Sequence, residues 1–135
     1  MSPEMILAIA GGVIGVIGLL IIVVRKAPKR VKSTHYTKKW REIQRMCADK
    51  QDWNHAIIHA DMLLDEVLEK KKTAGNTMGE RMVAAQDKFT ANDKLWVAHK
   101  LAVSLRDNGD KQVTQTVVKN ALVTFRQALR DLGAL

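Results

Sequence analysis

Two histidines on one predicted helix have the spacing of a pair of metal ligands. His55 and His59 are four residues apart, so their side chains project from the same face of a helix. A zinc protease of the His-Glu-x-x-His type needs a glutamate directly after the first histidine, and Ala56 occupies that position. Asp61 and His99 are candidates for a third ligand. Because histidines beside an apolar stripe commonly lie at its rim in contact with water, we expect no metal site here.

Asp61 and Asp65 form a second candidate constellation, a carboxylate pair separated by one helical turn. General acid–base catalysis needs such groups in a cleft with perturbed pKa values. These two lie on the charged flank of a predicted helix, where we expect them to be solvated or paired with lysines of a neighbouring helix. The single cysteine, Cys47, has no evident base partner and cannot form an intrachain disulfide. The sequence therefore predicts no enzyme, no catalytic residue, no cofactor and no small-molecule substrate.

The elements that would position these groups are helices. From Tyr36 onwards apolar residues recur at spacings of three and four, which is the pattern of amphipathic helices, and no alternating strand pattern appears. The strongest stripe follows Asp52, a candidate N-cap, and ends at the cations of 70–72, which suit a helix C-terminus. We predict an all-α protein, with a single N-terminal transmembrane helix followed by an antiparallel helical bundle of about five helices.

Capping patterns mark where several of these helices begin and end. Thr77 precedes Glu80 by three residues, the spacing of a capping box. Thr90 and Asp93 repeat that spacing, with Asn92 as an alternative cap. Two glycines are suited to helix C-termini and predict the ends of the last two helices: Gly109 and Gly133.

The longest apolar run covers residues 5–24 and contains no charge and no hydroxyl. As a helix it would span roughly 30 Å, the thickness of the hydrocarbon core of a bilayer. Basic residues follow the run directly, so the positive-inside rule predicts an N-terminus outside the cell and a cytoplasmic C-terminal domain. We therefore expect a single-pass protein of the cell membrane, divided into a short extracytoplasmic N-terminus (1–4), a transmembrane helix (5–24), a basic juxtamembrane linker (25–35) and a cytoplasmic bundle (36–135).

The net charge of +8 originates beside this run. Residues 25–41 hold eight basic residues and no acidic one, and the remaining 14 basic residues balance the 14 acidic ones. This placement favours topology and anionic lipid headgroups as the role of the charge, and it argues against a nucleic-acid-binding face. The candidate headgroup contacts are Arg25, Lys26, Lys29, Arg30 and Lys32.

Three glycines of the apolar run lie within about 60° of one another on a helix. Gly11, Gly15 and Gly18 form a stripe of small residues, which allows two helix backbones to approach closely. The stripe predicts helix–helix packing, although glycine is also common in single-pass anchors without any such role.

The distribution of residues over 36–135 resembles that of a group of small bacterial proteins, many with one N-terminal membrane helix, whose remaining part is similar to the HEPN superfamily of helical bundles. The resemblance is most specific at Thr77–Met82, which reads Thr-Met-Gly-Glu-Arg-Met, and at Leu95–Leu101, which reads Leu-Trp-Val-Ala-His-Lys-Leu. It extends to Asp52-Trp53, Ala56–Ile58, Ala60-Asp61, Leu63–Asp65 and the ending Ala128–Gly133. The motif positions that carry it are Trp53, Asp61, Thr77, Glu80, Arg81, Trp96 and His99.

Catalytic HEPN domains are metal-independent ribonucleases that use an arginine followed by a histidine four to six residues later, in a cleft between two subunits. The resemblance implies such a motif directly after Leu101, where residues 102–107 contain neither the motif arginine nor its histidine. Arg30 and His35 have a fitting spacing but belong to the basic linker, so we interpret that match as chance. The resemblance therefore implies a non-catalytic HEPN-like bundle, in a superfamily whose members are commonly dimeric.

Three functional hypotheses follow. The first is a membrane-anchored, non-catalytic interaction or scaffold module at the cytoplasmic face of the membrane, with a protein partner or a second copy of the chain. The second is an RNA- or nucleotide-binding HEPN-like domain that uses the basic residues of 25–41. The third is an enzyme built on His55, His59 and Asp61.

Overall fold

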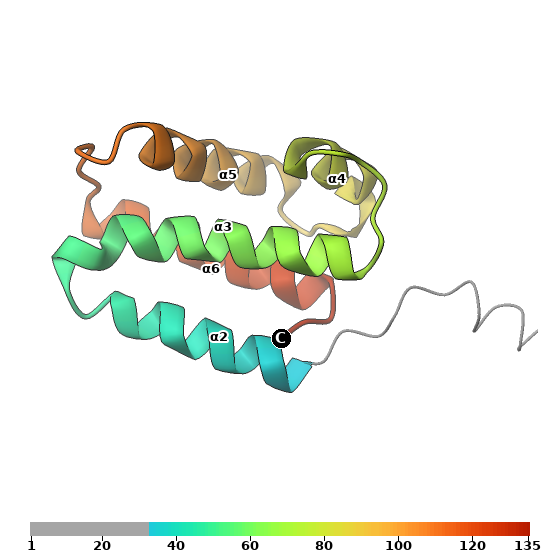
Figure 1. Ribbon diagram of the computed structural model, residues 1–135, viewed down its shortest axis with the longest axis horizontal. Helices are drawn as coiled ribbons and strands as arrows, with labels where there is room; N and C mark the ends of the chain where they lie inside the picture. Colours follow the sequence, from blue (N-terminus) through green and yellow to red (C-terminus); the bar gives the residue numbers. More distant parts are fainter. Residues whose placement is uncertain (1–32) are drawn as a thin grey trace, which may run out of the picture.

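The computed structural model describes residues 33–135, and these residues form five α-helices and no β-strand (Figure 1). Successive long helices run antiparallel, which confirms the predicted all-α helical bundle for this part of the chain. The α-helices are α2 (Ser33–Met46), α3 (Trp53–Lys70), α4 (Met78–Ala84), α5 (Asn92–Asp107) and α6 (Gln115–Asp131), with short 3-10 turns η1 (Lys50–Asp52) and η2 (Gln86–Lys88). α2 begins three residues before the predicted start of the bundle.

α3 is the central helix, and α2, α4, α5 and α6 all pack against it (Figure 1). Its apolar residues recur at spacings of three and four and come in adjacent pairs, which widens the buried stripe beyond that of a helix lying on one surface. The buried apolar residues of α3 are Ala56, Ile57, Ala60, Leu63, Leu64, Val67 and Leu68.

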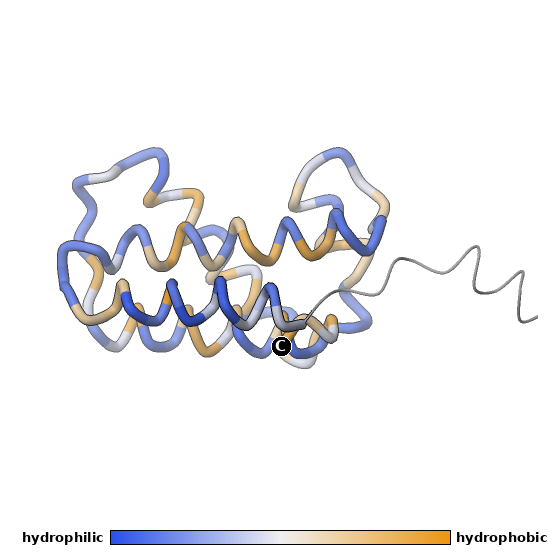
Figure 2. The backbone as a smooth tube through the Cα atoms, turned by 60° about the horizontal axis from the view of Figure 1, so that its bottom comes forward, coloured by the Kyte–Doolittle hydropathy of each residue, from blue (hydrophilic) through white to orange (hydrophobic). Residues whose placement is uncertain are grey.

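The outer helices each bury one face and leave the other to solvent. Figure 2 shows hydrophobic positions interspersed with hydrophilic ones along the helices. α2 buries Tyr36, Trp40 and Ile43, which follow one another at the predicted spacings of four and three residues. α6 buries Phe125 completely, together with a stripe that matches the predicted spacing: Val118, Ala121, Leu122, Ala128 and Leu129.

The predicted helix ends are confirmed at two places. Thr77 caps α4, since its Oγ1 accepts a hydrogen bond from the Glu80 amide at 3.2 Å, and the Glu80 carboxylate accepts one from the Asn76 amide at 2.6 Å. Gly133 follows α6 with φ +76°, the left-handed conformation in which glycine avoids the strain of a side chain.

Two other predictions of helix ends are wrong. α5 has Ala91 at its N-cap with no side-chain hydrogen bond, because the Thr90 hydroxyl donates instead to Asp131 of α6 at 2.7 Å. Gly109 lies outside the left-handed region, so it does not end α5 in the predicted way. At the start of α5, a contact outside the helix overrides the local pattern.

No helix among residues 33–135 is long and apolar enough to cross a bilayer. The longest, α3, has 18 residues and carries the charged side chains of Asp61, Asp65, Glu66 and Glu69. The predicted single-pass location in the cell membrane is corrected on this finding and is not carried further. The predicted transmembrane segment and residues 25–32 of the basic linker, with the glycine stripe and the headgroup candidates, lie outside the described residues. Residues 33–35 of the predicted linker belong to α2.

We expect Phe125→Ala to destabilise the bundle by about 3–5 kcal/mol, because Phe125 is fully buried and its loss leaves a cavity. Urea unfolding of the two proteins measures the difference. Val123→Ala is the matched control: Val123 lies on the same helix but is 60% exposed, so its loss should cost about 0.5 kcal/mol or less. Equal losses at the two positions would contradict the assigned orientation of α6.

The carboxylate of Asp131 joins the end of α6 to the start of α5. Its Oδ2 accepts from the Thr90 amide at 2.8 Å, and its Oδ1 accepts from the Thr90 hydroxyl and, at 2.9 Å, from the Gln127 amide. Burial acts to raise the pKa of Asp131, but the hydrogen bonds from Thr90 and Gln127 outweigh it and hold the pKa below its usual range.

A lowered pKa in the folded state means that this carboxylate stabilises the fold above about pH 4 and ceases to do so as the pH falls through the lowered value. We expect Asp131→Asn to lose about 1 kcal/mol of unfolding free energy at pH 7 and to show a smaller further loss in acid than the parent protein. Urea unfolding at neutral and acidic pH measures both effects. The exposed carboxylate Asp110, changed to asparagine, is the control; an acid response of Asp131→Asn equal to that of the parent would refute the role of Asp131.

Candidate functional site

A buried carboxylate lies at the interface between α3 and α5. Asp61 has an exposed fraction of 0%, and both of its oxygens are engaged. Oδ1 lies 2.8 Å from Nδ1 of His99, and Oδ2 accepts a hydrogen bond from the guanidinium of Arg106. A buried carboxylate is costly to desolvate unless charged or hydrogen-bonding groups surround it, and these two residues of α5 meet that requirement.

The spacing of α5 explains why two of its residues reach one carboxylate. His99 and Arg106 are seven residues apart, two helical turns, and therefore lie on the same face of α5. The His99 side chain is 13% exposed, and the ring of Trp96 lies edge-on to it with 5.9 Å between ring centroids. The carboxylate on Nδ1 and the indole beside the ring thus fix the orientation of His99.

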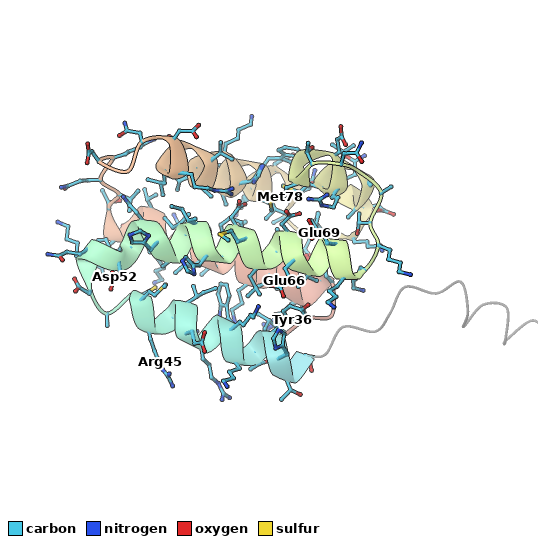
Figure 3. All side chains as sticks on the ribbon, viewed as in Figure 1. Tyr36, Arg45, Asp52, Glu66, Glu69 and Met78 are labelled. Atoms are coloured by element: carbon cyan, nitrogen blue, oxygen red, sulfur yellow. The ribbon has the colours of Figure 1, made fainter. Side chains whose placement is uncertain are left out.

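A second polar cluster lies one helical turn further along α3. Arg81 of α4 binds Asp65 through two hydrogen bonds of 2.8 and 3.0 Å, and it also contacts the Glu69 carboxylate at 3.2 Å. Figure 3 shows Glu69 of α3 on the side of α4. The hydrogen bond to Asp65 is the main cause that raises the pKa of Arg81; burial opposes it, and the charges of Asp65, Glu69 and Glu80 add to it.

Arg81 also holds the loop that leads into its own helix. Its guanidinium donates to the carbonyl oxygen of Gly75 at 3.2 Å. Gly75 has φ +135°, and a Cβ at that position would lie 2.8 Å from the backbone nitrogen of Arg81. Only glycine fits this close approach.

The motif residues lie in three different parts of the structure. Asp61, His99 and Trp96 come together between α3 and α5, and Thr77, Glu80 and Arg81 form the cap and ion pairs of α4. Trp53 lies at the other end of α3, where its indole nitrogen donates to the Cys47 carbonyl at 3.0 Å. Burial raises the pKa of the Cys47 thiol, which disfavours the reactive thiolate.

Sequence reasoning placed the carboxylates of α3 wrongly. Asp61 is neither solvated nor paired with a lysine, and Asp65 pairs with Arg81. Arg106 was missed as a partner of Asp61, although its spacing of two turns from His99 is a visible signal. The reason is that a helical period identifies the side of a helix on which a residue lies, whereas its partner depends on which neighbour packs there.

The geometry does not assemble the metal site considered from the sequence. His55 and His59 are exposed, whereas Asp61 is buried toward α5. Within residues 33–135 no three histidine, cysteine or acidic side chains form a group that could hold a metal ion. In the same residues His99 has Asp61 as its hydrogen-bond partner. The network therefore has the arrangement of a structural ion pair with an oriented histidine.

The surface offers a different kind of candidate site, on the exposed side of α6. One groove, of about 560 Å³, runs between α5 and α6, and a second, of about 460 Å³, runs between α2 and α6. We call them the α5–α6 groove and the α2–α6 groove. Val123 lines both and is 60% exposed, and Val97 and Val117 line the first with exposed fractions of 69% and 39%.

Comparison with known proteins gives no relative: no protein-family model, curated protein or solved structure matches this chain. The HEPN-like resemblance therefore stays a prediction.

We expect Asp61→Ala to cost about 2–3 kcal/mol of unfolding free energy, because it leaves a largely buried histidine without its hydrogen-bond partner and a half-exposed guanidinium without its carboxylate. Urea unfolding at neutral pH gives the value. Asp87→Ala removes an exposed carboxylate and should change stability by about 0.5 kcal/mol or less. A loss at Asp61 as small as that at Asp87 would show that the network does not stabilise the fold.

Proposed function

We propose that residues 33–135 form a non-catalytic helical interaction module that binds another protein through the exposed side of α6. The observation that carries this proposal is Val123, an exposed apolar side chain that lies between two grooves and lines both. Together with Val97 and Val117 it gives the α5–α6 groove three exposed apolar side chains. Such surfaces, when bordered by polar residues, are typical of protein–protein interaction sites.

The ion pairs and hydrogen bonds of the buried titratable groups support the non-catalytic part of the proposal. The carboxylates of Asp61 and Asp65 are bound by cations of the chain itself, and the imidazole of His99 is held by one of them. Groups arranged in this way stabilise helix packing. They leave no carboxylate of the network available to accept a proton from a substrate.

The HEPN-like interpretation is consistent with the same proposal. The stretch that follows Leu101 is where the ribonuclease motif of such domains is expected. Here Ala102 and Leu105 are buried in the core, and Arg106 binds Asp61. Residues that a catalytic relative would use for chemistry serve packing in this chain.

Site-specific crosslinking tests the proposal. A benzophenone amino acid at Val123, in the full chain expressed in its native cells, should give a covalent adduct with a protein. Val83 of α4 is the control position, because it is also an exposed valine, at 53%, but lies away from both grooves. Adducts at neither position, or equally at both, would overturn the proposal.

A further inference from the structure

The α2–α6 groove has a chemical character of its own. Its floor is apolar and includes Trp40, Val118 and Leu122. Two cations, Lys119 and Arg126, line it, and no acidic side chain of the described residues does. α2 and α6 both pack on α3 but make few close contacts with each other, so the groove follows the line along which they separate.

The spacing of the two cations defines the shape of a matching ligand. Lys119 and Arg126 are seven residues apart on α6, which places them on one face about 10 Å apart along the helix axis. The apolar residues Val118 and Leu122 lie in the same stretch of the groove. A ligand helix lying along α6 would complement this pattern if it carried an apolar stripe bordered by acidic residues seven positions apart. The acidic residues would then lie opposite the two cations.

Trp40 adds an independent observation. It lines the groove, is 5% exposed, and its indole N–H has no hydrogen-bond acceptor within residues 33–135. A buried donor without an acceptor is energetically unfavourable, and most buried donors in proteins are paired. The indole nitrogen itself is buried, so Trp40 contributes apolar ring atoms to the groove and no accessible hydrogen-bond donor.

We propose that the α2–α6 groove binds an acidic amphipathic helix of another protein, with its carboxylates on Lys119 and Arg126 and its apolar stripe against Trp40 and Leu122. This inference rests on the proposed interaction function and specifies the chemistry of the partner. A second copy of the same groove is a poor occupant, since self-pairing would bring these cations against like charges. Nucleic acid fits less well, because the floor between the two cations is apolar.

Fluorescence anisotropy with two labelled peptides tests the proposal on the full-length protein. Both peptides have about 18 residues and the same leucine stripe; one carries glutamates seven positions apart along its flanks, and the other carries lysines there. We expect the acidic peptide to bind at least about tenfold more tightly than the basic one.

A charge reversal identifies the groove. Lys119→Glu combined with Arg126→Glu should weaken the acidic peptide about tenfold or more and strengthen the basic one. The matched control is Lys100→Glu combined with Arg130→Glu, which reverses two exposed cations of α5 and α6 outside the groove and should leave both affinities within about twofold. Circular dichroism confirms that each variant is folded.

Several results would overturn the partner chemistry. The first two are equal binding of the two peptides and no binding of the acidic peptide. The third is a control variant that changes the affinities as much as the groove reversal does. The fourth is preferential binding of a single-stranded RNA oligonucleotide that the groove reversal abolishes. A crosslink from Val123 to a second copy of the chain would assign the surface to a homodimer. If Val123 crosslinks to another protein but the acidic peptide does not bind, only the partner chemistry fails; if the crosslink is absent as well, the interaction function fails with it.

Discussion

A buried carboxylate at the centre of the middle helix constrains how this bundle can pack. Asp61 lies on α3 with no exposed surface, so its charge must be balanced by neighbouring side chains. His99 and Arg106 supply that balance from α5. A shift of α5 by one turn, about 5.4 Å, would separate the carboxylate from both partners. Apolar packing alone tolerates such shifts more readily, so the ion pair sets the register of α5 on α3.

The same logic continues along α3. Asp61, Asp65 and Glu69 follow one another at intervals of four residues and therefore form a stripe along one side of the helix. α5 pairs with the first member, and Arg81 of α4 pairs with the other two. The acidic stripe of the central helix thus orders α4 and α5. Its apolar side packs against α6 and α2, and the ion pair between Glu66 and Lys39 adds to the contact with α2. The motif residues of the described part of the chain therefore stabilise the packing of the helices.

Local pattern predicted much of this fold and little of its polar interior. The spacing of apolar residues predicted the helices. The cap formed by Thr77 and Glu80 and the end of α6 at Gly133 were also predicted, because both depend on interactions within a few residues. The burial of Asp61 depends on α5, which is 38 residues away at His99. Thr90 failed as a cap for the same reason, because Asp131 competes for its hydroxyl from 41 residues away. The α2–α6 groove depends on three helices at once, so no single stretch of sequence reveals it.

The clamp of Arg81 on Gly75 has a consequence for how proteases meet the chain. The residues from Ala74 to Thr77 are exposed and lie between two helices, the setting in which polypeptides are usually nicked. Cleavage requires the loop to detach from its surroundings and extend into the enzyme. Here the carbonyl of Gly75 accepts a hydrogen bond from the same guanidinium that binds Asp65 of α3, so detachment of the loop must break this contact. The protection of this loop from proteases should therefore depend on the ion pair between Arg81 and Asp65.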